Sequence, residues 1–146
     1  MSRLMSVSHT EAQVRARTKT VTRRDGWRTV KVGDTLTLCP KVMGRRHRCD
    51  GCDGLGILRG TAFLGRRECP TCAGSGYVTE PLDRIVDVTV IAAFREPLDL
   101  ITPSEVVAEG FPDWTPEQFI DFYTATFKVP RDHVVTRIEW RYPEAD

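Results

Sequence analysis

A doubled cysteine–glycine motif constrains this chain more than any other feature of its sequence. The pattern C-x-x-C-x-G-x-G begins at Cys49 and again at Cys69, with sixteen residues between Cys52 and Cys69. Two thiolates three residues apart in a tight turn bind one side of a metal ion, and a second pair completes a tetrahedron. The glycines let each turn fold back towards the sulfurs, which a Cβ would obstruct. We therefore predict one zinc ion, bound by Cys49, Cys52, Cys69 and Cys72.

Four thiolates leave no open coordination position, so the predicted zinc is structural rather than catalytic. Two disulfide bonds in a secreted chain are the alternative, but the number of cysteines is odd and no secretion signal precedes them. The fifth thiol, Cys39, is interpreted as a small buried hydrophobic residue at the end of a strand. The doubled motif resembles the cysteine-rich zinc region of DnaJ-type chaperones. The chain has no His-Pro-Asp motif of a J domain, so the resemblance implies no co-chaperone function.

The remaining sequence is typical of a folded α+β protein. With 146 residues, 40% of them hydrophobic and 28% charged, the chain is long enough for one domain with its own core. Capping-box sequences predict helices that begin at Ser8, Thr102 and Thr115. Alternating residues predict strands over 35–39, 86–94 and 134–142. Because helices and strands do not alternate regularly, a small, strongly bent sheet or barrel with helices at its ends is favoured.

The segment 45–79 interrupts this pattern between two predicted strands. It is rich in glycine, cysteine and arginine and poor in core residues, so we interpret it as a finger inserted within one domain that spans 1–146. A hairpin is predicted between the cysteine pairs, with its turn near Gly65 and with Arg59, Arg66 and Arg67 displayed on it. Such a hairpin favours contacts with phosphates, although a solvated loop is an equal alternative.

Charge is distributed unevenly along the chain. The net charge is +9 over 1–48 and −8 over 80–146, although the whole chain carries only +1. This asymmetry favours an anionic partner such as nucleic acid, unless the two halves pack together and neutralise each other. The best apolar stretch, 88–94, is far shorter than the 20 or so residues that a membrane-spanning helix needs. We expect a cytoplasmic protein with no membrane partner.

A basic segment with interspersed hydroxyls runs from Arg17 to Trp27 and contains Lys19-Thr-Val-Thr22-Arg23-Arg24. A cation-rich edge strand is one interpretation of it. The segment also resembles the G-x-K-T-x-T-x-R motif of ASCH domains, a branch of the PUA-like superfamily. The resemblance extends to 32–34, 95–102, 105–111 and 135–142, and so covers essentially everything except the insertion. It implies a small PUA-like β-barrel flanked by short helices, with a cleft for RNA, nucleosides or nucleotides.

The resemblance also implies roles for individual residues. Some bacterial ASCH proteins are amidohydrolases that remove the acetyl group of N4-acetylcytidine, and their catalytic lysine, threonine and glutamate correspond to Lys19, Thr22 and Glu109. A threonine hydroxyl needs a base to become nucleophilic, and a lysine with a lowered pKa can serve. A carboxylic acid can protonate the departing amine. Arg17 stands where the family often has glycine.

The same three residues also form a binding pocket without catalysis, because lysine and threonine can hold a phosphate or carbonyl while glutamate accepts from an exocyclic amine. Around them, the expected nucleic-acid-binding residues are Arg17, Arg23, Arg24 and Trp27, the last by stacking on a base. Three functions are therefore open. Recognition of RNA, a nucleoside or a nucleotide is favoured over hydrolysis of an acylated cytidine, and a protein-interaction module built on the zinc finger is the third.

Overall fold

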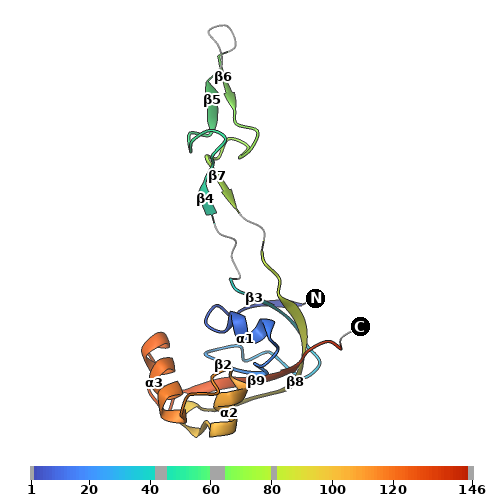
Figure 1. Ribbon diagram of the computed structural model, residues 1–146, viewed down its shortest axis with the longest axis vertical. Coiled ribbons are helices and arrows are strands. Elements are labelled where there is room, and N and C mark those ends of the chain that lie inside the picture. The colour runs from blue at the N-terminus through green and yellow to red at the C-terminus, as the bar shows by residue number, and fades with distance from the viewer. Residues whose placement is uncertain (1, 42–45, 60–64, 80–81, 145–146) are drawn as a thin grey trace. The chain divides into compact units, whose positions relative to one another are not determined.

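The computed structural model describes residues 2–41, 46–59, 65–79 and 82–144 (Figure 1). The chain divides into two compact units. We call Met1–Val42 with Asp83–Asp146 the main unit, and Met43–Leu82 the cysteine unit. The insertion predicted at 45–79 falls within the cysteine unit. In the described parts of the chain, every helix is too short or too polar to cross a lipid bilayer.

The main unit is built on a five-stranded sheet in the order β1-β3-β8-β9-β2. Strands β1 and β3 are parallel, and the other neighbouring strands are antiparallel. The predicted strands are present as β3, β8 and β9, so the mixed α+β class is confirmed. Strand β1 is not among the predictions, because four residues are too few for an alternating pattern. The strands are β1 (Arg3–Ser6), β2 (Val21–Arg24), β3 (Thr35–Cys39), β8 (Val86–Pro97) and β9 (Val134–Arg141).

The sheet curves strongly but does not close into the expected barrel (Figure 1). In the part of the chain that the structure describes, β1 and β2 are the two edges and do not pair. The side chain of Arg24, at the end of β2, spans the gap between them. Its Nη2 donates a hydrogen bond to the backbone oxygen of Ser6, at the end of β1, at 2.6 Å. A side chain therefore connects the two edges where a closed barrel would have a backbone ladder.

Two apolar clusters pack against opposite faces of the sheet. Ile138 and Trp140 of β9 belong to one cluster, together with residues of β1, β3, β8 and helix α1 (Glu11–Arg15). Val135 of β9 belongs to the other, with residues of α2 (Pro103–Ala108), α3 (Pro116–Phe127) and the short turn η1 (Leu98–Leu100). The period of two predicted for 134–142 agrees with this division, because Ile138 and Trp140 are two residues apart in one cluster, and Val135, an odd number of positions from both, lies in the other.

Two of the three predicted helix starts are confirmed. The hydroxyl of Thr115 accepts from the Gln118 amide at 3.2 Å, and the Gln118 side chain accepts from the Thr115 amide at 2.8 Å, a complete capping box for α3. The hydroxyl of Thr102 likewise accepts from the Glu105 amide at the start of α2. The Glu105 carboxylate, however, accepts from Arg137 at 2.6 Å, because a buried guanidinium on β9 needs a counter-charge.

The third predicted capping box is wrong. Helix α1 begins at Glu11 with Thr10 at the N-cap, and no side chain caps it. The Thr10 amide donates to the Val7 carbonyl at 2.9 Å, so a turn occupies the residues where the helix was expected to start. Ser8 therefore does not cap the helix.

The apolar face predicted for β8 changes side within the strand. Val88 and Val90 are buried as expected, but the register with β9 shifts between Val90 and Ala92. After this bulge Ala93 packs against the core, whereas Phe94 is 48% exposed. An extra residue in one strand reverses the alternation beyond it, which a fixed period of two cannot anticipate.

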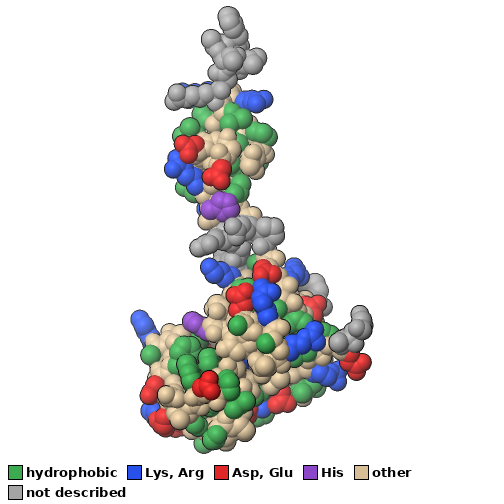
Figure 2. Space-filling model, viewed as in Figure 1, with side chains coloured by type: hydrophobic (Ala, Val, Ile, Leu, Met, Phe, Trp, Pro, Cys, Tyr) green, Lys and Arg blue, Asp and Glu red, His purple; other side chains and the backbone are tan. Residues whose placement is uncertain are grey.

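The cysteine unit consists of two short antiparallel ribbons around the four cysteines. Strand β4 (Arg46–Arg48) pairs with β7 (Tyr77–Thr79), and β5 (Ile57–Arg59) pairs with β6 (Arg66–Glu68). The β5–β6 pairing confirms the predicted hairpin, although 60–64 of its turn lie outside the described residues. Basic and acidic side chains both lie on the surface of this unit (Figure 2).

Candidate functional site

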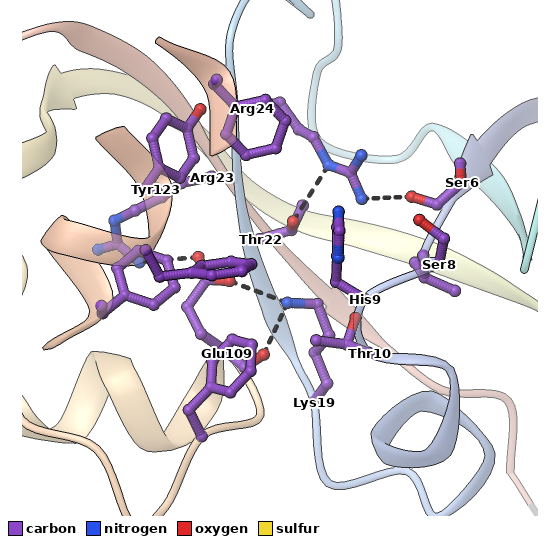
Figure 3. A pocket seen from close by; sticks show the side chains of 15 residues that line it. Ser6, Ser8, His9, Thr10, Lys19, Thr22, Arg23, Arg24, Glu109 and Tyr123 are labelled. Carbon is purple, nitrogen blue, oxygen red and sulfur yellow. Dashed lines mark hydrogen bonds and ion pairs between the residues drawn. The ribbon is translucent and has the colours of Figure 1, made fainter. Parts of the chain in front are cut away.

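A pocket of about 220 Å³ opens in the main unit beside β2 (Figure 3). Its walls come from the segment between β1 and α1, from β2 and Lys19 just ahead of it, from the end of α2, and from α3. One group of lining side chains is polar or charged: Ser6, Ser8, His9, Thr10, Lys19, Thr22, Arg23, Arg24 and Glu109. The other group is aromatic: Phe111, Phe119, Phe122, Tyr123 and Phe127.

A buried ion pair forms one side of the pocket. The ammonium nitrogen of Lys19 donates to Glu109 Oε2 at 2.8 Å and to the Glu109 backbone oxygen at 2.7 Å. Both side chains are 3% exposed. Because each charge has lost most of its water, the pair is held together by Coulomb attraction in a region of low dielectric. It joins residues 90 positions apart in the sequence.

Local backbone geometry brings the two partners together. Glu109 is the C-cap residue of helix α2. Gly110 follows it with a φ of +106°, a conformation that favours glycine. The amide of Thr20 donates to the Ala108 carbonyl at 2.8 Å, so the chain that carries Lys19 runs directly beside this turn. The hydroxyl of Tyr142 donates to the Lys19 carbonyl and fixes the same segment from the other side.

Arginines and carboxylates next to the Lys19–Glu109 pair form a network. Arg23 Nη1 donates to Glu109 Oε1 at 3.3 Å, and Arg23 Nη2 donates to Glu96 at 2.8 Å and lies 3.5 Å from Glu105. Glu105 also accepts from Arg137. Both oxygens of Glu109 are therefore bound, one by Lys19 and one by Arg23, which fixes the orientation of its carboxylate.

Two groups of the pocket have shifted protonation equilibria. Burial lowers the pKa of Lys19, although the nearby Glu109 carboxylate opposes that shift. Burial raises the pKa of Tyr123 to about 12, so its phenol keeps its proton. The Tyr123 hydroxyl is buried and has no hydrogen-bond partner among the described residues. The pocket therefore contains a lysine, Lys19, that loses its proton more readily than usual. It also contains the Tyr123 hydroxyl, which has no acceptor among the described residues.

The predicted residues Lys19, Thr22 and Glu109 all line this pocket (Figure 3). The structure joins Lys19 to Glu109 directly. It joins Thr22 to Arg24, whose Nε donates to the Thr22 hydroxyl oxygen at 3.2 Å. Because that oxygen acts as an acceptor, the hydroxyl proton is available for another group.

The expected nucleic-acid-binding residues are in four different environments. Arg23 and Arg24 both line the pocket, but Arg23 is 3% exposed and its guanidinium is bound by carboxylates, which leaves it less available to nucleic acid than Arg24. Trp27 is not among the residues that line the pocket. It is partly buried against the core, and the Arg3 guanidinium lies 4.3 Å from the centroid of its ring. Arg17 is exposed and donates to the Pro143 carbonyl.

Several pocket residues are not among the predicted site residues. Phe119, Phe122 and Tyr123 of α3 have the spacing of an ordinary apolar helix face, so nothing in the sequence separates pocket walls from core. Ser8 and His9 were expected at the start of a helix, a placement that the turn at Val7–Thr10 overturns. The spacing of hydroxyls and histidine near a short strand carries no signal for a pocket.

The four predicted metal-ligating cysteines form the centre of the cysteine unit. Their sulfurs all lie within 4.8 Å of one another, and all four side chains are buried. The sulfurs of Cys52 and Cys72 are 3.7 Å apart, too far for a disulfide bond. Cys39 is buried separately in the main unit.

The two copies of the motif adopt nearly the same backbone structure. The Gly56 amide donates to Cys52 Sγ at 3.1 Å, and the Gly76 amide donates to Cys72 Sγ at 3.2 Å. Glycine is required at both positions: φ is about +80° at each, and an added Cβ would lie 2.5 Å or 2.6 Å from a backbone oxygen of the other copy. The predicted role of these glycines is confirmed.

This arrangement fits a tetrahedral metal centre. A metal–sulfur bond of about 2.3 Å implies sulfur–sulfur edges of about 3.8 Å, close to the 3.7 Å between Cys52 and Cys72. Burial would raise the pKa of the Cys72 thiol, but amides of Gly76 and Gly74 and the neighbouring thiols lower it to about 6. Burial raises that of Cys49 to about 11. The thiolate that a metal binds is thus already favoured at Cys72.

Comparison with known proteins found no matching family model, no matching curated protein and no matching solved structure. The ASCH and DnaJ-type resemblances therefore rest on the sequence motifs themselves. What the structure adds to them is geometric: a small pocket around Lys19, Thr22 and Glu109, and a cluster of four cysteine sulfurs.

Proposed function

We propose that the main unit recognises a nucleobase in the pocket around Lys19, Thr22 and Glu109, and that the ligand is a nucleoside, a nucleotide or RNA. The observation that carries the proposal is the combination of aromatic walls with a buried, oriented carboxylate and ammonium. Aromatic side chains stack on the faces of bases, and a few fixed polar groups read their edges. The ASCH-like motif supplies the same expectation from sequence.

Cytosine suits the polar side of this pocket. A glutamate accepts a hydrogen bond from the exocyclic amine of cytosine, and donors such as the Thr22 hydroxyl complement its carbonyl oxygen and ring nitrogen. The cavity of about 220 Å³ is smaller than the roughly 300–1,000 Å³ of drug-sized ligands, so it accommodates a base with part of its sugar.

Binding can be tested with Thr22→Val, which keeps the shape of the side chain and leaves the Lys19–Glu109 pair in place. We expect this variant to bind cytidine about 3- to 10-fold more weakly, the effect of losing one uncharged hydrogen bond. Thr18→Val is the matched control, because Thr18 is exposed and outside the pocket. Titration calorimetry measures both affinities, and equal affinities of the two variants would contradict the proposed role of Thr22.

Hydrolysis of N4-acetylcytidine is the second candidate function, favoured by the lowered pKa of Lys19 in a pocket that also holds a hydroxyl. The mechanism implied by the ASCH resemblance starts from the form of the pair in which the proton of Lys19 has moved to Glu109. Thr22 Oγ then bonds to the acetyl carbon while neutral Lys19 takes the hydroxyl proton. The carbon–nitrogen bond then breaks, and the cytidine nitrogen takes a proton, a step that the resemblance assigns to Glu109. Water hydrolyses the acetyl-threonine and releases acetate.

Chromatography of N4-acetylcytidine incubated with the protein distinguishes catalysis from binding. If the pocket is catalytic, the wild-type chain releases equal amounts of cytidine and acetate, and Thr22→Val lowers the rate at least about 10³-fold because the nucleophile is gone. The Thr18→Val control should retain the wild-type rate. Binding of cytidine without any release of acetate would restrict the function to recognition.

For the cysteine unit, we propose a structural zinc ion bound by Cys49, Cys52, Cys69 and Cys72. Four thiolates in a tetrahedral arrangement are a donor set typical of structural zinc, and they leave no position for a substrate or water. When bound, the metal would supply a cross-link between the two copies of the motif. The buried sulfurs and the amide donors to Cys52 and Cys72 support this assignment.

Arg66 and Arg67 are exposed on β6, and we propose that they contact phosphates of RNA. Arg59, the third predicted residue, lies opposite Arg66 in the same hairpin.

Replacing Arg66 and Arg67 with glutamine should reduce the slope of log K against log salt by about 1.4, since each contact to single-stranded RNA contributes about 0.7. Filter binding over a salt series measures the slope.

The matched control replaces two exposed arginines of the main unit, Arg28 and Arg141, which lie outside the pocket. This control should leave the slope unchanged. Intact RNA binding with an unchanged slope in the Arg66 and Arg67 double variant would instead favour the third function, a finger that binds a protein partner.

A further inference from the structure

Arg24 differs from the other lysine and arginine residues that line the pocket, because no carboxylate pairs with it in the described parts of the chain. Lys19 is paired with Glu109, and the Arg23 guanidinium is surrounded by carboxylates. Arg24 instead meets neutral oxygens. Its Nε donates to the Thr22 hydroxyl at 3.2 Å, and its Nη2 donates to the Ser6 carbonyl at 2.6 Å. Among the described residues, no carboxylate therefore lies within ion-pair distance of its guanidinium.

The Arg24 guanidinium also has donors that these two contacts do not use. Arginine offers five N–H groups in a planar fork, and the bonds to Thr22 and Ser6 account for two of them. Burial lowers the pKa of Arg24, which means that the charged form is poorly solvated where it lies. An anion placed beside the guanidinium would satisfy both the spare donors and the charge.

Hydroxyl groups near Arg24 are suited to the same anion. Figure 3 has Ser6, Ser8 and His9 on the side of the pocket where the Arg24 guanidinium lies, and the Lys19–Glu109 pair on another side. Ser8 is exposed and lines the pocket, so its hydroxyl is available to a bound anion. One side of the pocket therefore carries hydrogen-bond donors suited to an anion, those of Arg24 and Ser8. The Lys19–Glu109 ion pair lies on another side.

We propose that the ligand of this pocket carries a phosphate group, which binds beside Arg24 while the base binds beside Lys19 and Glu109. The inference rests on the proposed nucleobase recognition and narrows it from neutral nucleosides to phosphate-bearing ligands. Arginine binds phosphate through two parallel N–H donors, for which Arg24 has donors to spare. The phosphate can belong to a free mononucleotide or to the backbone of an RNA strand, and both present the same oxygens.

Titration calorimetry of the full chain with four probes tests the proposal. The probes are cytidine, cytidine 5′-monophosphate, a cytidine trinucleotide without terminal phosphates, and inorganic phosphate. We expect the monophosphate or the trinucleotide to bind about 10- to 100-fold more tightly than cytidine, as charge-assisted hydrogen bonds to a phosphate provide. Tighter binding of the trinucleotide identifies RNA as the source of the phosphate, and tighter binding of the monophosphate identifies a free nucleotide. Either result supports the proposal.

Three variants connect the effect to Arg24. Arg24→Gln should remove the preference for phosphate, measured as the ratio between the affinities of the same variant for the phosphate-bearing probe and for cytidine, whereas Arg24→Lys, which keeps the charge, should retain part of it. Arg28→Gln is the control, an exposed arginine outside the pocket, and should behave like the wild type. Thermal melts confirm that each variant is folded, since Arg24→Gln also loses the bond to the Ser6 carbonyl.

The outcomes separate this inference from the proposed function. Cytidine binding with no gain from phosphate in the wild type would overturn the phosphate inference and leave nucleobase recognition standing. Arg24-dependent binding of inorganic phosphate without any binding of cytidine would support the anion subsite and overturn nucleobase recognition. Failure of the wild-type chain to bind any of the four probes would overturn both.

Discussion

Replacing Glu109 with glutamine is expected to lower the free energy of unfolding of the main unit by about 3–5 kcal/mol. The substitution keeps the size of the side chain but removes the charge that Lys19 and Arg23 share. Among the described residues, the buried Lys19 ammonium would then have no carboxylate partner, while Arg23 would keep Glu96 and Glu105. Urea denaturation followed by far-ultraviolet circular dichroism measures the change.

Glu117→Gln provides the matched control. Glu117 accepts from Arg131 at 2.8 Å, a distance equal to that between Lys19 and Glu109, but both side chains of this pair are largely exposed. Water already solvates these charges, so we expect little change in stability. The double variant Lys19→Met, Glu109→Leu should recover much of the loss, because it removes both buried charges together. A loss for Glu109→Gln no larger than that for Glu117→Gln would contradict a buried, desolvated pair.

Removal of the metal is expected to unfold the cysteine unit and leave the main unit folded. Among the described residues of the cysteine unit, the buried core consists of the four cysteines, with Leu58 and Val78 packed against them, which is too little apolar surface to hold the ribbons together. Small zinc units of this kind lose their structure without metal. The main unit has two apolar clusters of its own.

Amide NMR spectra recorded before and after chelation separate the two units. Signals from 46–59 and 65–79 should collapse to the narrow dispersion of an unfolded chain, while those of the main unit stay in place. Mass spectrometry under native conditions should find one zinc ion per chain in the wild type and in Cys39→Ala, and none firmly held in the double variant Cys52→Ser, Cys72→Ser. Ordered signals from the cysteine unit in the metal-free protein, or loss of the main-unit signals, would be inconsistent with this expectation.

The candidate metal site could be predicted almost completely from the sequence, because its geometry is local. Each C-x-x-C-x-G-x-G copy determines its own turn, and the amide donors to Cys52 and Cys72 lie within four residues of the sulfurs they contact. The pairing of the two copies follows from the ribbons on either side of them. Local hydrogen bonds and glycine conformations are what a motif encodes best.

The pocket was only partly predictable. The ASCH-like motif points to Lys19, Thr22 and Glu109, but it gives neighbouring arginines the same expected role. Arg23 and Arg24 are adjacent on β2, and both line the pocket. The Arg23 guanidinium is bound by carboxylates, whereas that of Arg24 donates to the Ser6 carbonyl, a difference that depends on which elements pack against each side chain.

By itself, the sequence determined the α+β class, the strands β3 and β9, the capped starts of α2 and α3, and the cluster of four cysteines. These features depend on residues close together along the chain, where periodicity, capping and turn geometry act directly. Only the tertiary structure decided that the sheet stays open between β1 and β2, and that Lys19 forms an ion pair with Glu109 while Arg24 has no carboxylate within ion-pair distance among the described residues. The physical reason is that pairing of buried charges depends on long-range packing, which places groups some 90 residues apart at hydrogen-bonding distance.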